Sequence, residues 1–289
     1  PVVGFAQICD AGVDAGNRDF VYMKRMAEDL GYDVTVTDVS NDFITLGIWG
    51  PNARTTMAKV VTDPDALSHE NFPFAAIKTI EIAGKKVTAF RISYVGEQGW
   101  ELHMAYDDGL AVWDAFRDLD VTPVGVETYA NTRRVEKSLR LQNADLLTEY
   151  NLLEADLARP KVKDADFIGK EAYLAHRAKD QQTATLCTLV MTDNVDGGGV
   201  ARYPVGTFPI VDPDTGDVIE DAEGRLSYTT SMAFGPTIGK NIALGYLPPE
   251  HAVKGKALQI EYFNESYPVE VAGVGYEPLY DPENLKPRS

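Results

Sequence analysis

The sequence predicts an α+β fold, in which α/β layers come first and a small antiparallel β-barrel of jelly-roll type follows. From residue 37 to residue 178, strand patterns alternate with amphipathic helices and are joined by hairpins, which favours antiparallel layers over a doubly wound parallel sheet. From residue 179 onward, short β-rich runs follow one another closely, with proline and glycine between them. We therefore divide the chain into residues 1–36, 37–178 and 179–289.

The first segment combines a strand pattern with a helix. VVGFAQIC, at residues 2–9, is typical of a buried strand, and Asn17 or Asp19 can cap the helix that follows. Gly31 is expected to end this helix. Its apolar residues at helical spacing are Phe20, Met23, Ala27 and Leu30.

The middle segment contains two pairs of strand patterns and three helical ones. We expect strands over 33–39 and 43–50, a helix opened by Pro51, a hairpin turning at Ala83 and Gly84, and helices over 109–119 and 125–141. In the helix over 109–119, the buried stripe is predicted to consist of Leu110, Trp113 and Phe116.

The last segment is predicted to form the barrel. Its β-rich runs are TLCTLVMT, YPVGTFPIV, IALGYLP, ALQIEYF and YPVEVAGV, which lie between residues 185 and 274. The tail over 281–289 is expected to be irregular.

Composition excludes several classes of partner. A formal net charge of −17 and a pI near 4.6 argue against nucleic acid and against an anionic membrane surface. A small anionic ligand is compatible with this charge, because a local basic patch decides that binding. The two cysteines, Cys9 and Cys187, and four scattered histidines form no disulfide or zinc pattern, so no metal is expected. Without a membrane-length apolar run or a signal-peptide pattern, we expect a cytoplasmic location.

The stretch over 91–104 contains the residues of greatest chemical interest. A turn built on Gly96 and Gly99 precedes a strand pattern, in which alternation places Trp100, Leu102 and Met104 on one face. Glu101 and His103 then lie on the other face. That face points either to solvent or into a cleft.

Four motifs in order resemble the glycine-cleavage T-protein family, the tetrahydrofolate-dependent aminomethyltransferases. The first is SYVGEQGWEL at residues 93–102. The others are TRRVEKSLRLQNADL with NLLEADL, then ADFIGKEAYL, and YTTSMAFGPTIGKNIALGYLP, together spanning residues 132–248. Within the family, the chain looks most like the folate domains of dimethylglycine and sarcosine dehydrogenases, through residues 93–102 and the SHENFPF segment at 68–74. The resemblance implies an aminomethyltransferase-like fold with a C-terminal barrel.

The resemblance also implies a folate site. Glu101 is expected to accept the two adjacent donors on the pterin edge, and Tyr94 to pack as an aromatic wall against the flat ligand. Arg134 occupies the arginine of the family's L-R-L-E pattern and resembles a folate contact. On an ideal helix Glu136 is turned about 200° away from Arg134, so only one of the two is expected to face a cleft. Asn17 matches an asparagine of the family's V-N-A-x-N-R segment, or it simply caps the helix.

The activity implied is aminomethyl or methyl transfer to tetrahydrofolate from a methylated amine. The family's catalytic G-G-x-x-D-D segment has no counterpart here, so no catalytic residue is assigned. Residues 1–36 then read as the remnant of a first α+β domain, and the chain as a fragment or as one that needs a second polypeptide for its N-terminal half. The alternatives are a non-catalytic paralogue or structural subunit, and the C-terminal folate domain of a flavoprotein demethylating dehydrogenase.

Overall fold

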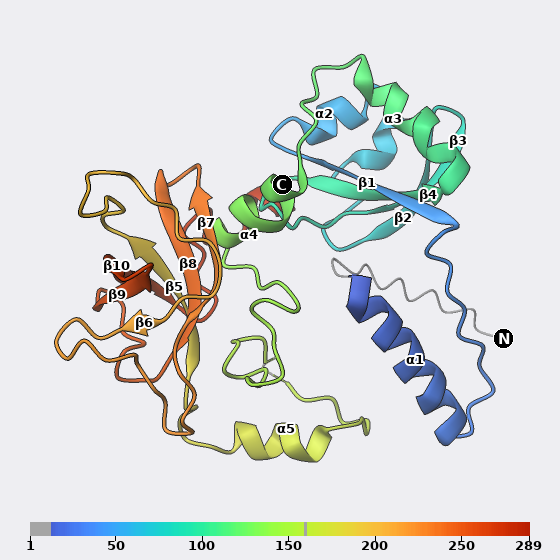
Figure 1. Ribbon diagram of the computed structural model, residues 1–289. Helices are drawn as coiled ribbons and strands as arrows, with labels where there is room; N and C mark the ends of the chain where they lie inside the picture. The colour runs from blue at the N-terminus through green and yellow to red at the C-terminus, as the bar shows by residue number, and fades with distance from the viewer. Residues whose placement is uncertain (1–12, 159–160) are drawn as a thin grey trace.

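The computed structural model describes residues 13–158 and 161–289, with side chains from Arg18 onward. A helix-covered antiparallel sheet comes first and a second antiparallel sheet, curled into a half-barrel, follows it (Figure 1). This confirms the predicted α+β fold class with a C-terminal barrel. The predicted strand over 2–9 lies outside the described residues. The proposed boundaries at residues 36 and 178 stay a prediction.

The first sheet has four strands in the order β1-β4-β3-β2, all antiparallel. They are β1 (Phe43–Trp49), β2 (Ile77–Ile82), β3 (Lys85–Phe90) and β4 (Gly99–Ala105). Ala83 and Gly84 both have positive φ and connect β2 to β3, which confirms the predicted hairpin. Alternation along β4 also holds, because Trp100, Leu102 and Met104 are all buried in one hydrophobic core.

Helices cover the core face of this sheet (Figure 1). They are α2 (Ala53–Met57), α3 (Gly109–Arg117) and the 3-10 turns at Pro64–Leu67 and Tyr106–Asp108. The predicted stripe of α3 was partly wrong, since Leu110 is 70% and Trp113 45% exposed. Phe116 is buried as predicted. Gly109 packs so closely on Ile44 that a Cβ there would lie 2.6 Å from Ile44 Cγ2, and Val112 joins Phe116 in the core in place of Leu110 and Trp113.

Two expectations near the N-terminus need correction. Helix α1 (Val13–Asp29) begins before both proposed caps, although Gly31, at φ +68°, ends it as predicted. Residues 33–39 form no strand. No strand among the described residues hydrogen-bonds with this segment, and Val34 and Val39 are exposed.

The helix expected over 125–141 is shorter than predicted. It consists of a π-helical turn, η3 (Thr128–Arg133), followed by α4 (Arg134–Glu136), and it lies between the sheet and the barrel (Figure 1). Ser138 leaves the helix with φ +51°. Its hydroxyl lies 2.8 Å from Thr188 Oγ1 and bonds the Glu277 carbonyl, so polar contacts with the barrel accompany the early end.

The second sheet has the order β6-β9-β10-β5-β8-β7 and is antiparallel throughout. Its strands are β5 (Thr185–Met191), β6 (Ile210–Val211), β7 (Thr229–Gly235), β8 (Lys240–Leu247), β9 (Ala257–Tyr262) and β10 (Glu265–Val274). Helix α5 (Lys170–Arg177) precedes them. The tail is not wholly irregular, because α6 (Leu285–Arg288) closes it. Within residues 13–158 and 161–289, no helix combines the length and apolarity that a bilayer crossing requires.

Candidate functional site

Glu101 lies on the face of β4 opposite the hydrophobic core, and its side chain is nearly buried. Glu101 is 9% exposed and His103 3%. His103 Nε2 lies 3.5 Å from Glu101 Oε2, and its Nδ1 lies 2.8 Å from Thr45 Oγ1. Among the described residues, no lysine or arginine forms an ion pair with Glu101. A nearly buried carboxylate of this kind retains acceptor capacity for an incoming donor.

Aromatic rings flank Glu101 on both neighbouring strands. On β1, Gly47 is the register partner of Glu101. The Trp49 ring lies over Gly47 so closely that a Cβ there would be 2.1 Å from the indole, so only glycine lets the ring lie beside Glu101. On β3, Phe90 is the partner of Glu101, and its ring centroid lies 4.4 Å from that of His103.

Tyr94 belongs to an aromatic row that begins at Trp49. Trp49 stacks on Tyr129, with centroids 5.3 Å apart and planes at 19°, and Tyr129 lies 5.5 Å from Tyr94. Trp49 Nε1 donates to the Ile92 carbonyl at 3.0 Å. We did not expect Trp49 or Tyr129. Trp49 shares the strand parity of Gly47, but which residue faces Glu101 is set by a register that only the folded sheet reveals.

The hydroxyl of Tyr94 is a protonated donor. It donates to the Arg140 carbonyl at 2.7 Å. Burial raises its pKa to about 12; the charge of Arg134 opposes this shift, while Asp145 and Tyr129 add to it. The phenol therefore stays neutral at physiological pH.

Arg134 is buried inside the protein. Its guanidinium donates to Asp145 Oδ2 at 2.8 Å, to Ser231 Oγ at 2.7 Å and to the Leu139 carbonyl at 3.0 Å, while Nε donates to the Ala130 carbonyl. Each of its three nitrogens thus already has an acceptor in this chain. A folate contact from Arg134 stays a prediction.

Glu136 is buried too, and it contacts the β7–β8 connection. Its Oε1 accepts the Thr237 amide at 2.6 Å and the Ile238 amide at 3.1 Å, and its Oε2 accepts from Arg133 at 2.8 Å. Arg134 therefore bonds to β7, and Glu136 bonds to the loop that follows β7. Their shared role is to hold η3 and α4 against the barrel.

The turn before β4 carries a second acidic residue, Glu97. Its Oε1 accepts from Arg133 Nη2 at 3.1 Å and from the Tyr280 hydroxyl. Gly96, at φ +75°, lies against Lys137, whose Cγ would be 2.5 Å from a Cβ at this position. The motif's glycine is thus required by both the turn and the packing. The sequence shows Glu97 but not its partners, which are 36 and 183 residues away.

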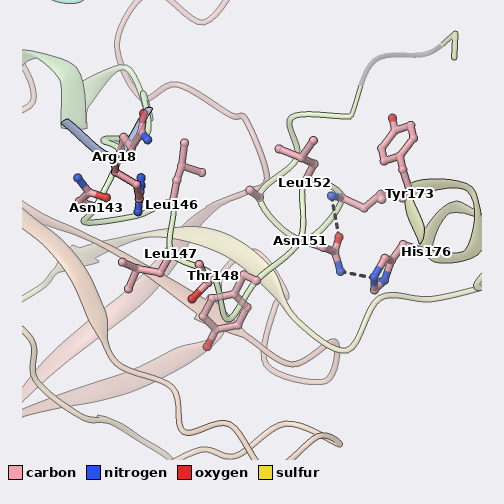
Figure 2. A pocket seen from close by; sticks show the side chains of 13 residues that line it. Arg18, Asn143, Leu146, Leu147, Thr148, Asn151, Leu152, Tyr173 and His176 are labelled. Carbon is pink, nitrogen blue, oxygen red and sulfur yellow. Dashed lines mark hydrogen bonds between the residues drawn. The ribbon is translucent and has the colours of Figure 1, made fainter. Parts of the chain in front are cut away.

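A cavity with a volume of about 650 Å³ lies elsewhere. Figure 2 shows Arg18 and Asn143 at one end and Tyr173 and His176 at the other. None of Glu101, Tyr94 and Arg134 lines it; the predicted Asn17 precedes Arg18 in α1, but its side chain is outside the described residues. Four leucines line much of the cavity wall: Leu146, Leu147, Leu152 and Leu153.

We take the Glu101 face of β4, not this cavity, as the candidate site. Asn151, one of the polar residues that line the cavity, already donates from its side-chain amide to Glu154 Oε2 at 2.9 Å and lies 3.4 Å from His176 Nδ1. Glu101, by contrast, combines a nearly buried charge with spare acceptor capacity and flat aromatic neighbours. No group of three or more potential metal ligands occurs among the described residues.

Comparison with known proteins decides the family. Residues 10–162 match the GCVT N-terminal domain, and residues 207–281 match the glycine cleavage T-protein C-terminal barrel domain. The chain belongs to the glycine-cleavage T-protein family. The first match alone covers more than half of the 289 residues. It contains both Glu101 and Arg134.

Two relatives of this T-protein family chain carry the names of different enzymes. Dimethylglycine dehydrogenase, mitochondrial, from Homo sapiens is 31% identical over 267 residues, which is 90% of this chain but 28% of that protein. Aminomethyltransferase from Listeria welshimeri is 32% identical over 257 residues, covering 88% of this chain and 64% of that protein. The chain therefore spans less than a third of one relative and less than two thirds of the other.

The fold is shared with a solved structure. The glycine cleavage system aminomethyltransferase T from Bartonella henselae superposes with a TM-score of 0.69 at 20% identity, covering 90% of this chain and 65% of that one. This structural similarity supports the α+β layers and the barrel described above. At 20% identity it is evidence for a shared fold only.

Proposed function

We propose that this T-protein family chain binds tetrahydrofolate and takes part in the transfer of a one-carbon unit to it from a methylated amine. The observation that carries the proposal is the Glu101 carboxylate, which is nearly buried beside aromatic rings and has spare acceptor capacity. When bound, reduced folate supplies the nitrogen atom that accepts the one-carbon unit. The protein's contribution is to hold the pterin and to exclude water around it.

Glu101 would hold the pterin by its hydrogen-bonding edge. The ring N–H and the exocyclic amino group are adjacent donors, and a carboxylate accepts both in a bidentate pair. Such charge-assisted bonds are about twice as strong as neutral ones. The contact with His103 Nε2, at 3.5 Å, positions one carboxylate oxygen and so orients the other.

The aromatic row would hold the plane of the pterin. Trp49 lies beside Glu101, and the stacked pair with Tyr129 continues toward Tyr94. Stacking on such rings is worth about 0.5–1.5 kcal/mol beyond area burial, which is enough to orient a flat heterocycle against one carboxylate. Tyr94 takes part through its ring, because its hydroxyl is engaged by the Arg140 carbonyl.

The methylated amine is proposed from the dehydrogenase relative. A protein named dimethylglycine dehydrogenase is 31% identical to this chain, and the match covers 90% of the length of this chain. Since the chain spans 28% of that relative, an alternative is that these residues act as the folate-binding part of a larger demethylating enzyme. On either reading the folate site is the same.

Isothermal titration with tetrahydrofolate tests the proposal. We expect saturable binding to the intact protein, and a loss of about 10- to 100-fold in affinity for Glu101→Gln, since the amide presents one donor where the ligand needs two acceptors. Glu270→Gln, on an exposed position of β10, is the matched control and should bind like the parent. Equal affinity of the parent and Glu101→Gln would refute the role of Glu101.

A further inference from the structure

A small pocket lies at the β9–β10 hairpin, on the side of the barrel away from the first sheet (Figure 1). Its volume is about 290 Å³. Three of the residues that line it are aromatic and three are charged: Tyr262, Phe263 and Tyr267, with Asp196, Arg202 and Glu265. We call it the hairpin pocket. None of its residues belongs to the sheet that carries Glu101, so the pocket is separate from the proposed folate site.

The aromatic rings of the hairpin pocket stand across one another. The centroids of Tyr262 and Phe263 are 4.6 Å apart with planes at 72°, and those of Tyr262 and Tyr267 are 6.2 Å apart with planes at 63°. In the pairing of β9 with β10, Tyr262 lies opposite Glu265, and Tyr267 follows Glu265 by two residues. The side chains of all three therefore leave the same face of the hairpin. The pocket thus combines angled ring faces with a carboxylate beside them.

Phe263 occupies a position that neither the turn nor the core requires it to fill. The loop of the hairpin consists of Phe263 and Asn264, at φ +51° and +61°. Asparagine tolerates this left-handed backbone, whereas a bulky residue such as phenylalanine rarely adopts it. Phe263 is also 81% exposed. Backbone strain combined with an exposed ring favours a role for this ring in binding.

The charges at the hairpin pocket favour a cation. Arg202 Nε donates to Asp196 Oδ2 at 2.6 Å, so these two charges neutralise each other. Glu265 Oε2 accepts the Gly197 amide at 2.9 Å, and within residues 13–158 and 161–289 no lysine or arginine forms an ion pair with Glu265. One negative charge therefore remains beside three aromatic rings. The face of such a ring also attracts a positive charge, through its quadrupole.

Among cations, a methylated ammonium group suits these walls best. A metal ion or a primary ammonium needs several oxygen acceptors in place of its hydration shell, which aromatic rings do not supply. Methyl groups on the nitrogen spread the positive charge over an apolar surface that contacts ring faces on several sides. A volume of about 290 Å³ is at the small end of ligand sites, which fits a compact head group.

We infer that the hairpin pocket binds a methylated ammonium group, with the rings of Tyr262, Phe263 and Tyr267 against its methyl groups and Glu265 as its counter-charge. Two kinds of molecule carry such a group: a free quaternary amine, and a protein with a trimethylated lysine side chain. The inference goes beyond the proposed function, because it concerns a site on the barrel that acts whether or not Glu101 binds folate.

Titration of the whole chain without folate, followed by nuclear magnetic resonance, tests the site. The probes are choline and its uncharged isostere, in which a carbon atom replaces the nitrogen. We expect saturable binding of choline and at least tenfold weaker binding of the isostere, because only the ammonium group gains from the ring faces and from Glu265. Equal affinity for the two probes would overturn the inference, as would the absence of saturable choline binding.

A peptide with one trimethylated lysine, titrated in the same way, distinguishes the two sources of the group. Tighter binding of this peptide than of choline would assign the pocket to a methylated protein partner. Tighter binding of choline would assign it to a free amine. Either result supports recognition of the ammonium group.

The variant Phe263→Asn separates binding from folding. Asparagine suits the left-handed turn, so this variant should unfold at the same temperature as the parent or higher, while its affinity for choline falls about tenfold. Glu265→Gln should also weaken choline binding severalfold. Phe234→Asn, which removes a 45% exposed ring from the edge strand β7, is the matched control and should bind choline like the parent. Unchanged choline affinity in Phe263→Asn would contradict the assignment.

Discussion

The guanidinium of Arg134 donates to the carboxylate of Asp145 at 2.8 Å, and neither side chain is more than 1% exposed. Asp145 also accepts the Leu141 amide at 2.8 Å and the Ser231 hydroxyl at 2.7 Å. The pair therefore joins α4, the loop after it and strand β7. The aromatic row ends at this pair, since Tyr94 is close enough for both charges to act on its pKa.

Removing one member of this pair should destabilise the folded protein. We expect Asp145→Asn to lower the free energy of unfolding by about 3–5 kcal/mol, because Arg134 is left buried without its counter-charge. Urea unfolding monitored by circular dichroism measures the change. The exposed pair of Asp114 and Arg117, also 2.8 Å apart, is the control, and Asp114→Asn should cost less than about 1 kcal/mol. Similar losses in the two variants would show that burial is not what makes the Arg134 pair matter.

The packing of Gly96, in the turn before β4, can be tested by comparison with Gly84, which lies in the β2–β3 turn and has nearly the same φ. Gly96 has φ +75° and Gly84 φ +72°, but only Gly96 has a neighbour, Lys137, within reach of a Cβ. Gly84→Ala should cost about 1 kcal/mol from the left-handed backbone alone. Gly96→Ala should cost clearly more, as the methyl would lie 2.5 Å from Lys137 Cγ. Thermal unfolding gives both values, and a smaller loss at Gly96 than at Gly84 would contradict the packing described.

Tyr94 makes stability depend on alkaline pH. Its folded pKa is raised to about 12 from 10.0, chiefly by burial, so the unfolded chain gives up this proton first. The contribution is therefore fully present below pH 10 and is lost as the pH rises from 10 toward 12. We expect Tyr94→Phe to reduce the alkaline loss of stability, whereas Tyr106→Phe, at an exposed position, should leave it unchanged. A pH series of urea midpoints decides between these outcomes.

Local patterns predicted much of the fold because they act over a few residues. The β2–β3 hairpin follows from its turn residues, and the core face of β4 follows from alternation. The stripe of α3 could not be predicted, because the inward face is decided by the approach of Gly109 to Ile44, 65 positions away. The strand expected over 33–39 failed for a similar reason, since a strand requires a partner that its own sequence does not specify.

The residues of the candidate site likewise fall into those that local sequence predicts and those that depend on the folded structure. The motif over 93–102 points to Glu101 and Tyr94 directly, whereas Trp49 and Tyr129 enter only through the pairing of β1 with β4 and the position of η3. Arg134 and Glu136 could be placed on different sides of a helix, but not assigned to the barrel, because their partners lie about one hundred residues downstream.

The most direct test of the central proposal removes the same hydrogen bond from either side. Affinities of tetrahydrofolate and of its 2-desamino analogue are measured by calorimetry for the parent protein and for Glu101→Ala. If Glu101 accepts from the exocyclic amino group, the analogue should bind the parent about 10- to 100-fold more weakly, and the two ligands should bind Glu101→Ala almost equally. An analogue penalty of the same size in both proteins would contradict the pairing of Glu101 with the pterin.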